Sequence, residues 1–186
     1  MNVAVKRKMT VTEFLDWAEK QPKGRYELVD GEVIAMSPER NRHVVVKLNV
    51  ATALQSAVAE AQLDCMVFTD GATVVIDKHY SREPDAAVQC GPVDLDSLVL
   101  DNPLIVVEVL SPSSERSDTG EKLSEYFSVA SIQHYLIVNP FRRLVIHHRR
   151  MSDGKIETTI AETGEMVLSP PGLTIPIASF FRSIPS

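Results

Sequence analysis

Two carboxylates and one lysine lie in segments of this chain where a charge is costly. Asp85 begins the apolar run 85–90, and Glu108 interrupts the apolar run 104–110. Lys122 follows in an amphipathic segment. An ionised carboxylate among strand-forming residues loses its hydration unless a cation or hydrogen-bond donors replace it. Two such carboxylates on successive strands therefore predict a site for a divalent metal ion.

Mg²⁺ and Mn²⁺ prefer oxygen ligands in octahedral geometry and keep several waters, so one or two carboxylates and a backbone carbonyl suffice. We expect Asp85, Glu108 and the carbonyl of Val109 to hold the ion if the two strands are neighbours. Side chains alternate across a strand, so Glu108 can face away from Val109. Lys122 could orient or deprotonate a water molecule at the ion, because lysine shifts its pKa readily in a desolvated site.

Each of these residues also has a purely structural interpretation. Asp85 could simply begin a strand, and Glu108 and Lys122 could form an inert buried ion pair. Lys122 could also extend from its helix into solvent. Taken singly, each residue favours its structural role, because a buried charge is only a probabilistic indicator of function. The three together favour a site.

Three further residues are weaker candidates. Glu27 and Glu32 flank the dipeptide Asp30-Gly31 in a predicted hairpin, where exposed glutamates are common. His43 lies on the longest predicted helix and could reach the site, although a surface or capping role fits equally well.

The pattern of apolar residues and turns predicts a mixed α/β fold. A capping box over 10–13 begins a short helix that ends near Lys20, and Asp30-Gly31 joins the two strands of a hairpin. The next predicted elements are a helix over 40–62 and strands over 65–69, 72–77, 85–90 and 104–110. After them come a helix from Asp118 and Glu121 to about residue 130, a strand over 134–138 reached by a helical crossover, and a peripheral hairpin of strands 144–149 and 155–160. We therefore expect a mixed sheet flanked by helices.

Size and composition describe an ordinary globular chain. Its 186 residues fit a single domain over 1–186 with a core of about 25–140. No apolar run is long enough to cross a membrane, and no signal-peptide core follows the first basic residues, so we expect a cytoplasmic protein. The net charge of −6 argues against non-specific coating of nucleic acid. A basic cluster over 142–150 is interpreted as solvated surface.

The two cysteines, Cys65 and Cys90, each lie in an apolar stretch without a partner at metal-ligand or redox spacing. Free cysteine is among the most buried residue types, so we expect two buried, reduced thiols.

An ordered set of short motifs runs through the chain. They are RYELVDGE at 25–32, Met36-Ser37-Pro38, His43, Pro84-Asp85, VEVLSPS at 107–113, Lys122 and Tyr126. Over roughly residues 10 to 150 the sequence resembles a family of uncharacterised bacterial proteins. That family is classed with the endonucleases of the restriction-endonuclease-like PD-(D/E)XK superfamily.

The resemblance implies a mixed sheet flanked by helices, metal-dependent hydrolysis of phosphodiester bonds in nucleic acid, foremost DNA, and often a homodimer. Asp85 and Glu108 match the metal ligands, Glu27 an additional acidic residue near the N-terminus, and Lys122 the catalytic lysine. The usual lysine two positions after the glutamate is absent, because that position is Leu110. The family instead places its lysine on the following helix.

The favoured interpretation is thus a Mg²⁺- or Mn²⁺-dependent endonuclease. A non-catalytic nucleic-acid or protein interaction module on the same fold is the main alternative, since fold does not fix function and the acidic pI near 5.4 suits it. A toxin-like or mobile-element accessory role is a third interpretation, and no residue of the sequence distinguishes it from the other two.

Overall fold

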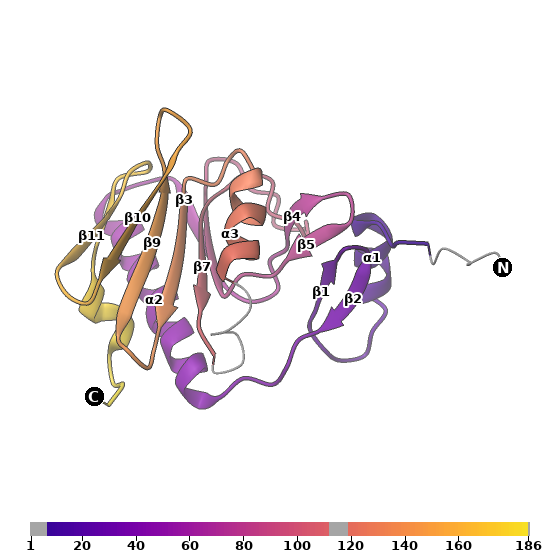
Figure 1. Ribbon diagram of the computed structural model, residues 1–186, viewed down its shortest axis with the longest axis horizontal. Coiled ribbons are helices and arrows are strands. Elements are labelled where there is room, and N and C mark those ends of the chain that lie inside the picture. The colour runs from indigo at the N-terminus through magenta and orange to yellow at the C-terminus, as the bar shows by residue number, and fades with distance from the viewer. Residues whose placement is uncertain (1–6, 112–118, 186) are drawn as a thin grey trace.

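A six-stranded mixed sheet with helices on both faces dominates the computed structural model, which describes residues 7–111 and 119–185 (Figure 1). Its strand order is β10-β9-β8-β7-β6-β3. These strands are β3 Cys65–Phe68, β6 Ala86–Cys90, β7 Pro103–Val109, β8 His134–Asn139, β9 Leu144–Arg150 and β10 Ile156–Ala161. Neighbours are antiparallel except β7 and β8, which are parallel and connected through helix α3, Thr119–Ser128. The predicted α/β class and the helical crossover are confirmed; Asp118, the expected start of this helix, lies outside the described residues.

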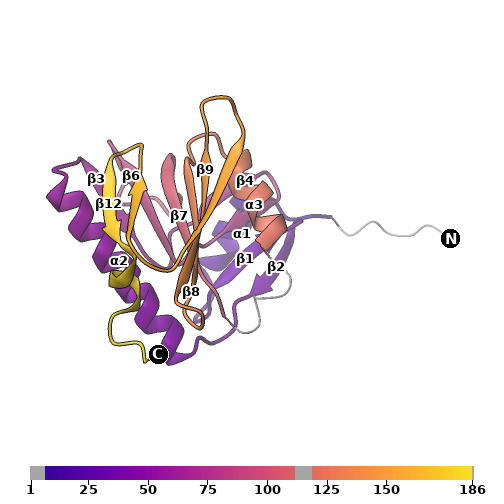
Figure 2. The same cartoon turned by 60° about the vertical axis from the view of Figure 1, so that its left-hand side comes forward.

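The two faces of the sheet have separate cores because side chains alternate along its strands. Ile105, Val107 and Val109 of β7 pack in the cluster that includes helix α2, Asn41–Glu60. Val106 and Leu110 pack in the cluster on the side of α3. Figure 2 shows α2 lying along one face of the sheet and α3 on the other. Glu108 therefore projects toward α3.

A smaller sheet with the order β2-β1-β5-β4 lies beside the first. Its strands are β1 Tyr26–Val29, β2 Glu32–Ala35, β4 Val74–Asp77 and β5 Tyr80–Arg82, and helix α1, Val11–Ala18, packs against it. The predicted capping box at Thr10 and Glu13 is present. Asp30 and Gly31 have φ of 50° and 73°, as the predicted hairpin turn requires. Strand β5 was not predicted, because Ser81 and Arg82 give its three residues no strand-like apolar pattern.

The C-terminal segment adds a two-stranded sheet and a short 3₁₀ helix that the sequence analysis did not predict. These elements are β11 Glu165–Leu168, β12 Leu173–Pro176 and η1 Ile177–Phe181. Their buried apolar residues, among them Leu168, Leu173 and Phe180, join the core cluster of α2. Within the described ranges no helix has both the length and the apolar character of a membrane span.

Two expectations about side chains are wrong. Cys65 and Cys90 are partly buried and joined by a disulfide, because the antiparallel register of β3 and β6 places them opposite each other. The basic segment 142–150 is only partly solvated surface. His147 and His148 are buried, and the Arg150 guanidinium donates hydrogen bonds to carbonyl groups at the end of α3 and just beyond it.

Candidate active site

Asp85 and Glu108 meet at one end of the large sheet. Ala86 of β6 pairs with Val107 of β7. Asp85 directly precedes β6, and Glu108 is the next residue of β7 after Val107. Asp85 is 5% exposed, and its Oδ2 accepts a hydrogen bond of 2.7 Å from the Val109 amide. The expectation that the two carboxylates lie on neighbouring strands is confirmed.

Helix α3 brings two polar groups to Glu108. The Lys122 Nζ lies 3.0 Å from Glu108 Oε1, and the Tyr126 hydroxyl donates a hydrogen bond of 2.6 Å to the same oxygen. Lys122 and Tyr126 are four residues apart and share a helix face, as predicted. Lys122 therefore points into the protein, with a side chain that is 14% exposed.

The surroundings shift the pKa values of Glu108 and Asp85 in opposite directions. Burial raises the pKa of Glu108, and the nearby charges of Asp85 and Glu27 raise it further. Lys122 and Tyr126 only partly offset this rise. Burial alone would also raise the pKa of Asp85, but His43, the Val109 amide and Lys47 outweigh it and lower that pKa.

Lys122 is held in its charged form. Burial alone would lower the pKa of Lys122, but the carboxylates of Glu108 and Glu27 outweigh burial and raise it. At neutral pH the group is therefore an ammonium, which donates hydrogen bonds and cannot accept a proton. This state favours the orienting role of Lys122 over the deprotonating one.

Glu27 lies beside this group but is anchored to a different cation. Its Oε2 accepts a hydrogen bond of 3.0 Å from Arg82, and its Oε1 accepts one of 3.2 Å from the Glu83 amide. Arg82 also binds Glu125 of α3 through two hydrogen bonds of 2.7 and 2.9 Å. Arg82 thus connects β5, β1 and α3 around the site.

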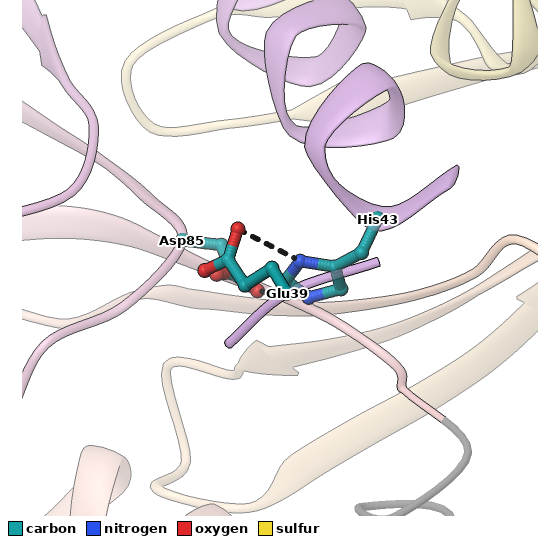
Figure 3. A group of neighbouring side chains, drawn as sticks. All are labelled: Glu39, His43 and Asp85. Carbon is teal, nitrogen blue, oxygen red and sulfur yellow. Dashed lines mark ion pairs between the residues drawn. The ribbon is translucent and has the colours of Figure 1, made fainter. Parts of the chain in front are cut away.

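His43 reaches the site from the first turn of α2. Its Nε2 lies 2.8 Å from the Val109 carbonyl oxygen and 3.3 Å from Asp85 Oδ2 (Figure 3). Burial alone would lower the pKa of His43, but Asp85, the Val109 carbonyl and Glu39 outweigh it and raise that pKa. One ligand atom from each of Glu39, His43 and Asp85 lies within 4.8 Å of the others. His43 therefore contacts two of the three oxygen-bearing groups that the sequence analysis assigned to a metal ion.

A second lysine, which the sequence analysis missed, supports Asp85 from α2. Lys47 Nζ lies 3.6 Å from Asp85 Oδ1, 2.6 Å from Glu39 and 2.7 Å from Asp70. Glu39, His43 and Lys47 recur at intervals of four, which is the signal that could have revealed one polar helix face directed at the site.

A cleft of about 680 Å³ lies between the small sheet and the large one. The three predicted carboxylates, Glu39 and His43 are among its lining residues, whereas Lys47 and Lys122 are not. Glu27, Asp85 and Glu108 lie among apolar side chains and two arginines, Arg40 and Arg42. The apolar members are Ile34, Met36, Pro38, Val109, Leu110, Pro140 and Phe141. The volume is within the range of pockets that bind small ligands.

The donor set suits a hard divalent cation. Asp85, Glu108 and the Val109 carbonyl present oxygen atoms at one end of the sheet, which is what Mg²⁺ and Mn²⁺ prefer. These oxygens already face groups that can carry positive charge, because His43 Nε2 lies beside Asp85 and the Val109 carbonyl and Lys122 Nζ lies beside Glu108. The donor types therefore suit such an ion, while the group of close ligand atoms found among the described residues is Glu39, His43 and Asp85 and does not include Glu108.

Comparison with known proteins gives matches over most of the chain. A family model described as "Uma2: Putative restriction endonuclease" matches residues 11–178. Two uncharacterized proteins of Synechocystis are similar to the chain. One is 29% identical over 79% of this chain and 77% of the relative, and the other is 25% identical over 82% and 87%. A crystal structure described as a putative nuclease belonging to DUF820, from Anabaena variabilis, shares the fold. Its TM-score is 0.68 at 19% identity, over 93% of this chain and 97% of that one.

Proposed function

This chain belongs to the Uma2 family of putative restriction endonucleases, and we propose that it hydrolyses phosphodiester bonds in nucleic acid, foremost DNA, with Mg²⁺ or Mn²⁺. The proposal includes a restriction-endonuclease-like arrangement of β6, β7 and α3. One observation carries it: Asp85, directly before β6, and Glu108 on β7 both line the cleft, with Lys122 Nζ 3.0 Å from Glu108 Oε1.

In this proposal Asp85, Glu108 and the Val109 carbonyl hold the metal ion. When bound, the ion supplies charge stabilisation at the phosphate and increases the acidity of water. The Lys122 ammonium orients the attacking water by hydrogen bonding and remains paired with Glu108. Tyr126 fixes the Glu108 carboxylate, while Glu27 adds negative charge that keeps Lys122 protonated.

Calorimetric titration with Mn²⁺ tests the metal site. We expect Asp85→Ala and Glu108→Ala each to abolish binding. Glu108→Ala should stay folded, because removing this carboxylate relieves like-charge repulsion. Asp85→Ala should lower stability, because it removes the partner of His43 and Lys47. Glu165→Ala, which removes an exposed carboxylate on β11, should bind as the wild type does. An unfolded Asp85→Ala or Glu108→Ala variant together with a wild type that binds no ion would instead support an inert ion pair.

We further propose a homodimer. Strand β10 is a free edge of the large sheet, and Ile160 on it is 66% exposed. Isologous pairing is a common way to cover such an edge. Light scattering at tens of micromolar, a concentration on the order of that used for structural work, should give the mass of a dimer, and a monomer mass would contradict the proposal.

A further inference from the structure

The lining of the cleft combines carboxylates with exposed apolar side chains. Ile34 and Phe141 both line the cleft, with 46% and 48% of their surface exposed. Phe141 follows β8, whereas Ile34 is on β2, so two distant segments contribute apolar surface next to the carboxylates. Apolar side chains left exposed beside a polar site indicate a ligand that brings an apolar face of its own.

The cations of the site are of two kinds. Arg25, Lys47, Arg82 and Lys122 all pair with carboxylates. Within ranges 7–111 and 119–185, neither Arg40 nor Arg42 forms an ion pair. Arg42 donates a hydrogen bond of 3.3 Å to the Pro140 carbonyl, and its guanidinium lies 5.6 Å from the centre of the Phe141 ring. Arg42, which has no acidic partner among the described residues, lies beside an exposed aromatic ring, and Arg40 lines the same cleft. This arrangement matches a phosphate followed by a base.

We propose that the cleft takes single-stranded nucleic acid, with an unpaired base stacked on Phe141 and its phosphate at Arg42. This inference rests on the proposed function, since it names the substrate class of the same site. In a duplex the base faces are stacked on one another, so the apolar wall would meet no complementary surface. Unpaired bases instead offer a face to an aromatic side chain.

The depth of the cleft and the net charge of the protein favour a single strand of nucleic acid over a duplex. Asp85 and Glu27 are only 5% and 9% exposed, so a phosphate must enter the cleft to reach them. A cleft of about 680 Å³ cannot enclose a duplex, whose major groove alone is about 12 Å wide. The net charge of −6 also disfavours the broad basic surface by which proteins hold duplex phosphates.

Fluorescence anisotropy with labelled oligonucleotides tests the proposal. Single-stranded DNA, single-stranded RNA and a blunt DNA duplex of one sequence are titrated with the full chain in Ca²⁺, which accepts the same oxygen ligands. We expect at least one single strand to bind tenfold or more tightly than the duplex. Phe141→Ala should weaken that binding by about 5-fold to 100-fold, the usual effect of removing one stacked base contact, and Phe141→Trp should retain it.

A control and a direct readout complete the test. Leu95→Ala removes another exposed apolar side chain, 74% exposed and absent from the cleft lining, and should leave binding unchanged. A 2-aminopurine base in the bound strand should be quenched by the wild type and less by Phe141→Ala. Duplex binding as tight as single-strand binding, or equal affinities for Phe141→Ala and Leu95→Ala, would overturn the inference.

The test separates this inference from the proposed function. Preferential cleavage of duplex DNA with Mg²⁺ would keep the hydrolase and reject the single-strand cleft. Phe141-dependent binding of single strands without cleavage in either Mg²⁺ or Mn²⁺ would keep the cleft and reject the hydrolase. Failure to bind any of the three oligonucleotides would reject the single-strand cleft.

Discussion

At the scale of single residues, His43 is the side chain whose position matters most beyond the expected set. Its Nε2 contacts the Val109 carbonyl and Asp85, the same groups that the proposed ion would use. Its raised pKa favours the protonated, cationic form of the ring. A protonated His43 and a metal ion therefore compete for these oxygens.

This competition predicts proton release on metal binding. The pKa of His43 is raised above 6.5, so the ring is protonated when the pH lies below this raised pKa. The affinity for Mn²⁺ should therefore fall as the pH falls through the pKa of His43. Calorimetry near pH 6.5, in two buffers of different ionisation enthalpy, should show that His43→Gln releases fewer protons than the wild type. His79→Gln, on the distant β4–β5 turn, is the control. Equal proton release by His43→Gln and the wild type would contradict the competition.

At the scale of elements, the site depends on three segments that Arg82 connects. The Arg82 guanidinium on β5 binds Glu27 of β1 and Glu125 of α3, and its side chain is 8% exposed. Removing one member of a buried ion pair leaves an uncompensated charge, which commonly costs 3 to 5 kcal/mol. Arg82 therefore determines both the position of α3 and the surroundings of Glu27.

Arg82→Ala should consequently lower the free energy of unfolding by about 3 kcal/mol. Urea denaturation monitored by circular dichroism measures the change. Arg149→Ala breaks an ion pair with Glu157 in which both side chains are at least one-third exposed, and it should cost less than about 1 kcal/mol. A similar small loss for both variants would show that Arg82 does not hold these elements together.

Elements with strong local signals were predictable from the sequence. The capping box of α1, the Asp30-Gly31 turn and the long amphipathic α2 each encode their conformation within a few residues. Strand β5 has only three residues, and Ser81 and Arg82 give it no apolar pattern. The strands of the 165–176 hairpin do alternate between exposed and buried residues, a local signal that the sequence analysis did not use. The position of β5 depends on long-range pairing, as between Leu28 and Ser81.

The site was predictable to a similar degree. Carboxylates in apolar strands drew attention to Asp85 and Glu108, and helix spacing placed Lys122 beside Tyr126. The partners of those residues come from distant segments. Neither Lys47 beside Asp85 nor Arg82 beside Glu27 has a local pattern that identifies its acidic partner, because tertiary packing alone brings them together.

At the scale of the whole molecule, a histidine pair couples the large sheet to the C-terminal hairpin. His134 Nδ1 and His147 Nε2 are 2.8 Å apart, and His134 Nε2 donates a hydrogen bond of 2.8 Å to the Pro170 carbonyl. Burial lowers the pKa of each histidine to about 4. Both are therefore neutral in the folded protein at neutral pH.

Acid should destabilise the fold through this pair. Between pH 6.5 and about 4 the unfolded chain binds protons at these histidines while the folded chain does not, so stability falls as the pH falls. The loss should level off for these groups below about pH 4, before Asp85, whose pKa is lowered below 3.8, is protonated. His147→Leu should flatten the dependence of unfolding free energy on pH in this window, as measured by urea titrations, and an unchanged slope would contradict the assignment.

Lys122 distinguishes the proposed enzyme from a non-catalytic binding module, because only an enzyme can lose hydrolysis when this side chain is removed. Lys122→Ala should leave Mn²⁺ affinity nearly unchanged, because Lys122 contributes no ligand. It should cut hydrolysis by about 10² or more, the usual effect of removing one preorganised hydrogen-bond donor. The most direct measurement is the initial rate of plasmid and single-strand cleavage in Mg²⁺ or Mn²⁺. Wild type, Lys122→Ala and Lys155→Ala, whose side chain is 82% exposed, are purified identically. We predict metal-dependent cleavage by the wild type and Lys155→Ala and its loss in Lys122→Ala. No cleavage by the wild type, or equal rates for all three proteins, would contradict the proposed catalytic site.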